Sequence, residues 1–193
     1  KKLTDAGCEV AEVDMPLSKY ALAVYYVIMP AESSTNLARY DGVRYGFYKS
    51  GADGIDDYSQ TRGAGFGAEV RRRILLGTYV LSHGYYDAYY RKATQVREML
   101  RVEFARAFQT FDAILLPTTP GPAFKLGSKT DDPLTMYLED IFTVTANIVG
   151  VPAISVPCGE ALEGGVRLPL GVQLMAPHCH EDILFALGKI VEA

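Results

Sequence analysis

The sequence has few cysteines, and they form no recognisable pattern. Three cysteines, Cys8, Cys158 and Cys179, occur among 193 residues, and no two of them make a C-x-x-C pair. An odd and sparse set of thiols is typical of a reducing compartment and not of a disulfide scaffold. We therefore expect a cytoplasmic protein.

Long apolar runs and an excess of positive charge are also missing. Runs such as 21–29 and 74–76 fall far short of the ~20 residues that a membrane-spanning helix needs, and no charged-then-apolar signal segment is present. The net charge of −4 disfavours a broad surface for nucleic-acid phosphates. These absences predict that the chain contacts neither a membrane nor, directly, a nucleic acid.

The composition is that of a globular domain. Hydrophobic residues make up 49% of the chain and charged residues 22%, which is enough apolar material for one sizeable core. No internal repeat or low-complexity tract occurs. We expect a single domain over 1–193.

Apolar periodicity and end signals predict both helices and strands. Two stretches lack such a pattern: 39–46, with a turn at Asp41-Gly42, and the Gly- and Asp-rich 51–67, which we expect to be a mobile surface segment. Strands separated by long helices predict an α/β fold, and apolar strands without alternation are expected to be buried on both faces. The predicted helices begin near Lys19 and cover 32–38, 68–82, 86–108 and 133–149, and the predicted strands cover 8–13, 113–116, 151–156 and 170–175.

A carboxylate interrupts the apolar helix predicted at 133–149, which Asp132 should cap. Asp140 forms a narrow polar stripe on this helix with Thr143 and Asn147. Burying a carboxylate alone would cost several kcal/mol, so Asp140 needs a cationic or hydrogen-bonding partner. A neighbouring Lys or Arg in a structural salt bridge, or a ligand, would serve.

Three consecutive arginines occupy positions 71–73, and they cannot act together because successive helix residues point about 100° apart. A helical wheel places Arg73 on the inner face near Gly77, which should leave space beside it, and Arg71 on the solvated face. A guanidinium suits a carboxylate because its planar fork makes two parallel hydrogen bonds. Arg73 on an α-carboxylate and Asp140 on an α-ammonium would bracket a free amino acid.

Four motifs occur in an order that few families share. The segment 25–46, YYVIMPAESSTNLARYDGVRYG, is followed by LLPTTP at 115–120, GVPAISVPCG at 150–159 and LPLGVQ at 168–173. On these residues the whole chain resembles the amidase-signature family and, within it, the A subunits of tRNA-dependent amidotransferases. The resemblance implies an α/β fold with a mixed β-sheet core flanked by helices.

The resemblance also implies a binding site for free glutamine. It places Tyr25, Arg73 and Asp140 at the positions that hold this substrate, with the arginine on the carboxylate, the aspartate on the amino group and the tyrosine near the side-chain amide. The correspondence at Arg73 and Asp140 needs no gap, whereas Tyr26 remains an alternative to Tyr25.

The family's nucleophilic serine, bridging cis-serine and catalytic lysine lie in a Gly/Ser-rich region, and no such region occurs in this chain. The segment 1–7 is typical of the last turn of a helix closed by Gly7. We therefore expect the C-terminal portion of an amidase catalytic domain, which carries no catalytic residue and is inactive as an isolated chain.

By resemblance, the complete protein would hydrolyse glutamine and supply ammonia to convert Glu-tRNA(Gln) to Gln-tRNA(Gln), Asp-tRNA(Asn) to Asn-tRNA(Asn), or both. A partner B subunit would hold the mischarged tRNA and activate it with ATP and magnesium, and a small C subunit would brace the complex. No cofactor is expected in this chain.

No metal site is expected either, because the adjacent residues of His178-Cys179-His180 cannot chelate one ion with ordinary geometry. Two alternative functions remain open at the level of sequence. One is a stand-alone amidase that acts on another amide, in which Arg73 and Asp140 would be structural. The other is a non-catalytic interaction module.

Overall fold

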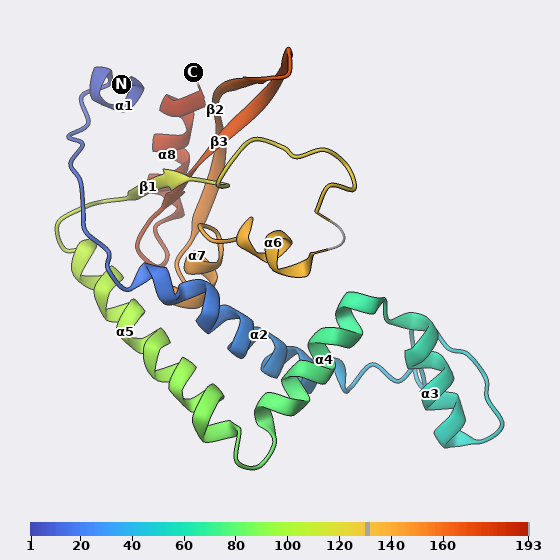
Figure 1. Cartoon of the computed structure of the whole chain (residues 1–193). Coiled ribbons are helices and arrows are strands. Elements are labelled where there is room, and N and C mark those ends of the chain that lie inside the picture. Colours follow the sequence, from blue (N-terminus) through green and yellow to red (C-terminus); the bar gives the residue numbers. More distant parts are fainter. Residues whose placement is uncertain (130–131, 193) are drawn as a thin grey trace. The chain divides into compact units, whose positions relative to one another are not determined.

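A computed structural model describes residues 1–129 and 132–192 of the chain (Figure 1). The chain divides into two compact units, the first formed by Lys1–Leu22 and Val96–Ala193 and the second by Ala23–Gln95. No helix among the described residues is both long and apolar enough to cross a bilayer. The expected single domain over 1–193 stays a prediction.

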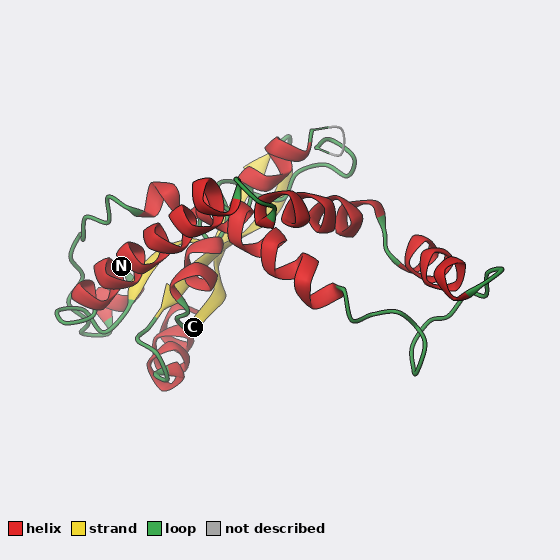
Figure 2. Ribbon diagram, turned by 90° about the horizontal axis from the view of Figure 1, so that it is seen from below, coloured by secondary structure: helices red, strands yellow, loops and turns green. Residues whose placement is uncertain are grey.

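The first unit is built on a small sheet, which Figure 2 shows in yellow. Its strands β1 (Ile114–Pro117), β2 (Ala153–Glu163) and β3 (Val166–Met175) lie in the order β1-β3-β2, and both pairings are antiparallel. Helices accompany the sheet, so the predicted α/β class is confirmed. The helical elements of this unit are α1 (Lys2–Asp5), the 3₁₀ turn η1 (Ser18–Tyr20), most of α5 (Lys92–Ala107), α6 (Pro133–Leu138), α7 (Val144–Val149) and α8 (Glu181–Glu192).

The last two strands form one hairpin and are longer than predicted. Gly164 and Gly165 both have positive φ, as a tight two-residue turn requires, so pairing continues up to Glu163 and Val166. Leu115 in β1 is 47% exposed, so the prediction that this strand is buried on both faces is wrong.

The strand predicted at 8–13 is absent from the described structure. A strand needs a hydrogen-bonded neighbour, and this segment pairs with none of β1, β2 and β3. Its side chains are mostly exposed, with Val10 at 64%. Alternation alone therefore misassigned this segment.

Helix α8 packs on the sheet and supplies the core of this unit. Leu184 of α8 is buried against Leu174 and Ala176, at the end of β3. The two ends of the chain meet here, because the Lys2 ammonium donates a 2.8 Å hydrogen bond to the Val191 carbonyl (Figure 1). The helix end predicted at Gly7 is confirmed, since Gly7 has a φ of +89° just after α1.

The second unit is helical. Helix α2 runs without interruption through Pro30, so the separate helix predicted at 32–38 is the end of α2. The stretch 51–67 was predicted as a mobile surface segment, but most of it is helix α3, because the Asp53 side chain caps its first turn by accepting from the N–H groups of Ile55 and Asp56. The helices of this unit are α2 (Ala21–Leu37), α3 (Gly54–Gly65), α4 (Ala68–Leu81), the π-helical turn η2 (Tyr86–Arg91) and the start of α5.

The helices predicted at 68–82 and 86–108 are confirmed as α4 and as η2 continued by α5. One face of α5 is apolar and packs inward in the first unit, where Leu100 and Phe104 are buried. The turn predicted at Asp41-Gly42 is also confirmed, because Asp41 accepts from the Val43 N–H and Gly42 has a φ of +75°.

A glycine lets α4 touch α2. A Cβ atom built on Gly77 would lie 1.9 Å from the Pro30 carbonyl oxygen, so no other residue fits there without moving a backbone. The space that the sequence predicted beside Gly77 is therefore filled by α2. Arg73 lies one turn earlier on α4 and is brought to the same helix.

We predict that Gly77→Ala destabilises the chain by about 3 kcal/mol or more, because the added methyl forces α2 and α4 apart. Thermal or denaturant unfolding followed by circular dichroism measures the change. Gly63→Ala is the matched control, since Gly63 lies inside α3 with open space around its Cβ position, and it should be neutral or stabilising. An unchanged stability in Gly77→Ala would contradict the close helix contact.

Candidate functional site

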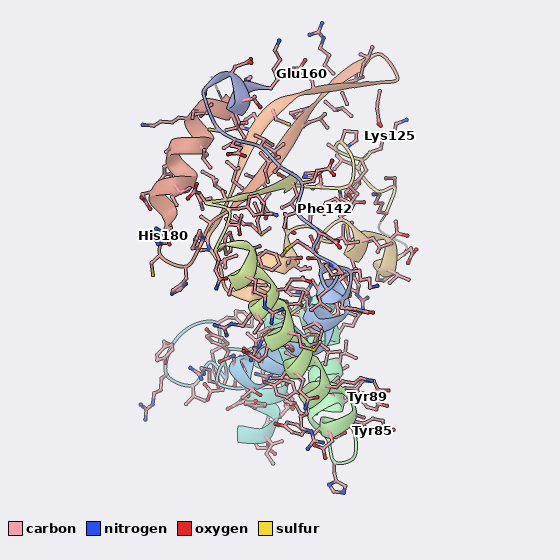
Figure 3. All side chains as sticks on the ribbon, turned by 90° about the vertical axis from the view of Figure 1, so that its left-hand side faces the viewer. Tyr85, Tyr89, Lys125, Phe142, Glu160 and His180 are labelled. Carbon is pink, nitrogen blue, oxygen red and sulfur yellow. The ribbon has the colours of Figure 1, made fainter. Side chains whose placement is uncertain are left out.

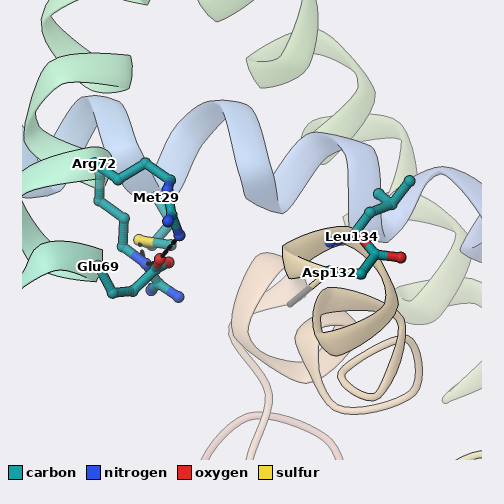
Figure 4. Close-up of polar contacts among 6 residues, drawn as sticks. Met29, Glu69, Arg72, Asp132 and Leu134 are labelled. Atoms are coloured by element: carbon teal, nitrogen blue, oxygen red, sulfur yellow. Dashed lines mark hydrogen bonds and ion pairs between the residues drawn. The ribbon is translucent and has the colours of Figure 1, made fainter. Parts of the chain in front are cut away.

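Arg73 lies on α4 in a cluster of polar and soft groups within the second unit. Its Nε donates to Glu69 Oε1 at 2.9 Å, and its Nη1 lies 3.4 Å from the sulfur of Met29 on α2. Glu69 also forms an ion pair with Arg72, and Figure 4 shows Glu69, Arg72 and Met29 together. Glu69 thus binds the Nε side of the Arg73 guanidinium and leaves the terminal nitrogens to other partners.

Arg73 is the half-buried arginine of the three, as predicted. Its side chain is 30% exposed, while Arg71 and Arg72 are exposed. Partial burial, the largest single influence, lowers the pKa of Arg73, but the hydrogen bond and charge of Glu69 with weaker contributions from Tyr25 and Tyr26 raise this pKa above its usual range. The terminal nitrogens carry four N–H groups, more than the weak Met29 acceptor can use, so this cation can still bind an anion.

Tyr25 and Tyr26 stand on α2 near Arg73. Both are half-buried, and their rings meet edge to face with centroids 5.1 Å apart. The charge interaction of both phenols with the guanidinium raises the pKa of Arg73. The structure brings Tyr25 and Arg73 together but leaves both tyrosines as candidates for contact with a substrate amide.

Asp140 lies in the first unit, and its setting differs from the prediction. The helix predicted at 133–149 is broken into α6 and α7, with Asp140 in the turn between them, where it is exposed and not buried on a helix. In this turn the N–H groups of Glu139, Asp140 and Ile141 bond to carbonyls three residues back, which tightens the chain.

The ends of the predicted helix are correct. Asp132 caps α6 by accepting from the Leu134 N–H, as Figure 4 shows, and its bonds from Thr135 and Leu134 lower the pKa of Asp132. Gly150 ends α7 in the left-handed conformation. The apolar residues of this stretch are only partly buried, because Leu134 is 67% exposed whereas Ile148 is buried.

A buried glutamine holds the turn that carries Asp140. Gln173 on β3 is 4% exposed, and its Nε2 donates to the Phe142 carbonyl at 3.1 Å. Phe142 is labelled in Figure 3 on this turn. The Thr143 hydroxyl donates to the Asp140 carbonyl, and the Asn147 amide donates to the Thr143 carbonyl. The backbone at Asp140 is therefore fixed from the sheet and from α7.

Sequence reasoning missed Glu69 and Gln173. Glu69 lies four residues before Arg73, the spacing at which helix side chains pair, so a search for i,i+4 partners could have found it. Gln173 is the one polar residue in the run 170–175, LGVQLM, and a lone polar group in a buried strand needs a partner.

Other groups carry less chemistry. Among the described residues no three His, Cys, Asp or Glu side chains gather closely enough to hold a metal ion. His178 to His180 lie in a loop after β3. Tyr79, Tyr85 and Tyr89 form an exposed ring cluster, of which Figure 3 labels the last two, and the hydrogen bond with Tyr85 raises the pKa of Tyr79 to about 12. The Tyr79 phenol therefore stays protonated and is no general base at neutral pH.

Residues 1–185 match the Amidase family. The chain is 56% identical over 188 residues to a protein of Desulfatibacillum aliphaticivorans and 56% identical over 194 residues to one of Acidobacterium capsulatum, both named as the A subunit of glutamyl-tRNA(Gln) amidotransferase. A relative from Clostridium acetobutylicum, 55% identical over 193 residues, is named as an A subunit of the same enzyme.

These matches cover 97 to 100% of this chain but 38 to 40% of the relatives, so the chain spans about two fifths of their length. The relatives from Acidobacterium capsulatum and Clostridium acetobutylicum align over the whole chain, which includes Tyr25, Arg73 and Asp140.

Solved structures agree on the fold. The chain matches 6-aminohexanoate cyclic dimer hydrolase with a TM-score of 0.68 at 18% identity, covering 99% of this chain and 38% of the other. It matches a bacterial aryl acylamidase of the amidase-signature family with a TM-score of 0.64 at 20% identity, covering 99% and 37%. The described fold and the family match over 1–185 lead to one assignment. The chain belongs to the amidase-signature family.

Proposed function

We propose that this chain is part of the glutamine-hydrolysing A subunit of a tRNA-dependent amidotransferase. The protein would release ammonia from glutamine for the conversion of Glu-tRNA(Gln) to Gln-tRNA(Gln), Asp-tRNA(Asn) to Asn-tRNA(Asn), or both. The observation that carries this proposal is the 53 to 56% identity, over nearly the whole chain, to proteins that bear this name.

In this proposal the chain binds the substrate and does not attack it. Arg73 holds the α-carboxylate of free glutamine, Asp140 holds its α-ammonium, and Tyr25 or Tyr26 lies near the side-chain amide. The environment of Arg73 supports its role. Glu69 takes the Nε side of the guanidinium, so the terminal nitrogens are oriented as a fork, the geometry that binds a carboxylate with two parallel hydrogen bonds.

The remaining parts of the reaction come from outside this chain. The nucleophilic serine, the cis-serine and the lysine that form and hydrolyse the glutamyl-enzyme would lie elsewhere in the protein. B and C subunits would complete the enzyme, and the B subunit would use ATP and magnesium on the mischarged tRNA. The purified chain alone should therefore release no ammonia from glutamine, and measurable turnover would contradict this division of labour.

A stand-alone amidase is the competing function. The solved structures of similar fold are named as hydrolases of other amides, but at 16 to 20% identity they support the fold alone. A half-buried arginine with terminal nitrogens available suits an amino-acid carboxylate better than a neutral amide. The two functions differ in one measurable way, the dependence of glutamine turnover on Arg73 and Asp140.

We predict that Arg73→Ala and Asp140→Asn each lower kcat/KM for glutamine by about a hundredfold or more in the intact protein with its partners, because each loses a charge-assisted contact with the substrate. Ammonia release measures the effect. Arg71→Ala is the matched control, since Arg71 lies exposed on the same helix and should retain nearly full activity.

Near-normal turnover in both variants, with the complex still assembled, would make the two charges structural and favour the stand-alone amidase. Loss of glutamine turnover in Arg73→Ala but not in Asp140→Asn would support the contact between Arg73 and the α-carboxylate and would remove Asp140 from the site. If Arg71→Ala lost as much glutamine turnover as Arg73→Ala, the loss would reflect damage to helix α4 and not the loss of a binding contact.

A second prediction concerns the support of the turn that carries Asp140. Gln173→Met keeps the side-chain volume roughly constant but removes the amide donor to the Phe142 carbonyl. We expect KM for glutamine to rise about tenfold while kcat changes little, because Asp140 loses its fixed position. Steady-state kinetics separates the two constants. Gln60→Met, at an exposed glutamine of α3, is the control, and an unchanged KM in Gln173→Met would remove Gln173 from the account.

A further inference from the structure

A groove in the second unit lies away from Tyr25 and Arg73 in sequence. It has a volume of about 400 Å³ and opens between the loop 39–47 and the second half of α3. Its walls carry charged and aromatic side chains. The lining residues used below are Arg39, Asp41, Arg44, Phe47, Arg62 and Phe66.

The groove is held in shape by contacts between its loop and α3. Thr61 of α3 is 4% exposed, and its hydroxyl accepts from the Lys49 N–H at 2.9 Å and donates to the Lys49 carbonyl at 3.1 Å. Arg62 donates to the carbonyls of Leu37 and Tyr40 at 2.8 and 3.0 Å. A wall that is fixed before binding loses less conformational entropy when a partner docks.

The loop also needs a glycine at its turn. A Cβ atom on Gly42 would lie 2.3 Å from the Phe47 carbonyl oxygen and 2.8 Å from the Thr61 methyl group. With its φ of +75°, Gly42 packs the loop tightly on α3. The loop conformation is therefore specified by sequence as well as by hydrogen bonds.

Charge in the groove is positive, although the whole chain is acidic at −4. Arg39, Arg44 and Arg62 line it, and none of the three forms an ion pair with a carboxylate of the described residues. Asp41 also lines the groove, and its carboxylate accepts from the Val43 N–H within the turn. The groove therefore has three cationic side chains and one carboxylate, which is already hydrogen-bonded within the turn. This excess of positive charge favours a ligand that is negatively charged.

Aromatic and apolar surface accompanies these charges. Tyr45 is 83% exposed, Val43 74% and Phe47 58%, values that leave a large apolar area in contact with water. The Arg62 guanidinium lies 4.8 Å from the Phe66 ring centre. Tyrosine, phenylalanine and arginine are the side chains enriched at protein interfaces, where a few of them carry most of the binding energy.

We propose that this groove docks an acidic segment of a partner protein. Carboxylates of the segment pair with Arg39 and Arg44, and an apolar side chain of the segment enters between Phe47 and Phe66. The inference does not depend on glutamine as the substrate, because no residue of the groove takes part in the proposed glutamine contact.

A protein segment fits better than a nucleic acid. Asp53, Asp56 and Asp57 stand at the start of α3, so the positive surface ends about 8 Å along the helix from Arg62. A phosphate backbone held by electrostatics needs several contacts along its length and would meet these carboxylates. A short acidic segment needs only the groove.

The test measures binding of a short fluorescent peptide of glutamate, leucine and glycine to the intact protein that contains this chain, by fluorescence anisotropy. The same peptide with glutamine in place of glutamate shows how much the negative charges contribute to binding. Polyuridylate represents a nucleic acid. Arg39→Glu and Arg44→Glu reverse the charge of the groove. Gly65→Leu fills it, since a Cβ atom there points at the Phe47 ring from 3.4 Å.

We expect the acidic peptide to bind at least about tenfold more weakly to each charge-reversal variant and to Gly65→Leu, and Lys92→Glu, an exposed lysine outside the groove, to behave like the parent. Circular dichroism confirms the fold of each variant. Failure of the acidic peptide to bind the parent overturns the proposal. Equal binding of the acidic peptide to all variants also overturns the proposal. So does polyuridylate that binds the parent more tightly than the acidic peptide does and no longer binds Arg44→Glu. A change of oligomeric state in Arg44→Glu, measured by sedimentation, would make the occupant a second copy and would overturn it as well.

Discussion

The contact between Gly77 and Pro30 determines what surrounds Arg73. Because Gly77 has no side chain, the backbones of α4 and α2 meet at this point, and Arg73, one turn earlier on α4, reaches Met29. Tyr25 and Tyr26 lie about one turn before Pro30 on α2 and affect the pKa of the same guanidinium. Gly77 thus sets the register between the helices that carry Arg73 and the two tyrosines.

The charge of Arg73 is then shaped by Glu69. An arginine buried to this extent is stabilised by a carboxylate on its own helix, and Glu69 binds its Nε and not its terminal nitrogens. Neutralisation and orientation come from the same contact. On the first unit, Gln173 performs the corresponding task for the turn of Asp140 through the Phe142 carbonyl, although it touches the backbone and not the carboxylate.

Much of this could be predicted from the sequence, because the signals are local. The wheel that put Arg73 inward and Arg71 outward depends only on helix periodicity, and Asp132 and Gly150 mark helix ends through their own capping chemistry. Two of the errors arose where distant residues decide. Alternation at 8–13 lacked a pairing strand, and the break around Asp140 involves Gln173, which lies more than thirty residues away.

The family assignment and the fold agree, and the proposed clamp is the claim that gives them a function. It is tested most directly by a crystal structure of the intact protein with L-glutamine bound. The account predicts the α-carboxylate on the terminal nitrogens of Arg73, with Glu69 still on Nε, and the α-ammonium on the Asp140 carboxylate. Glutamine bound without contact to either residue would contradict the account.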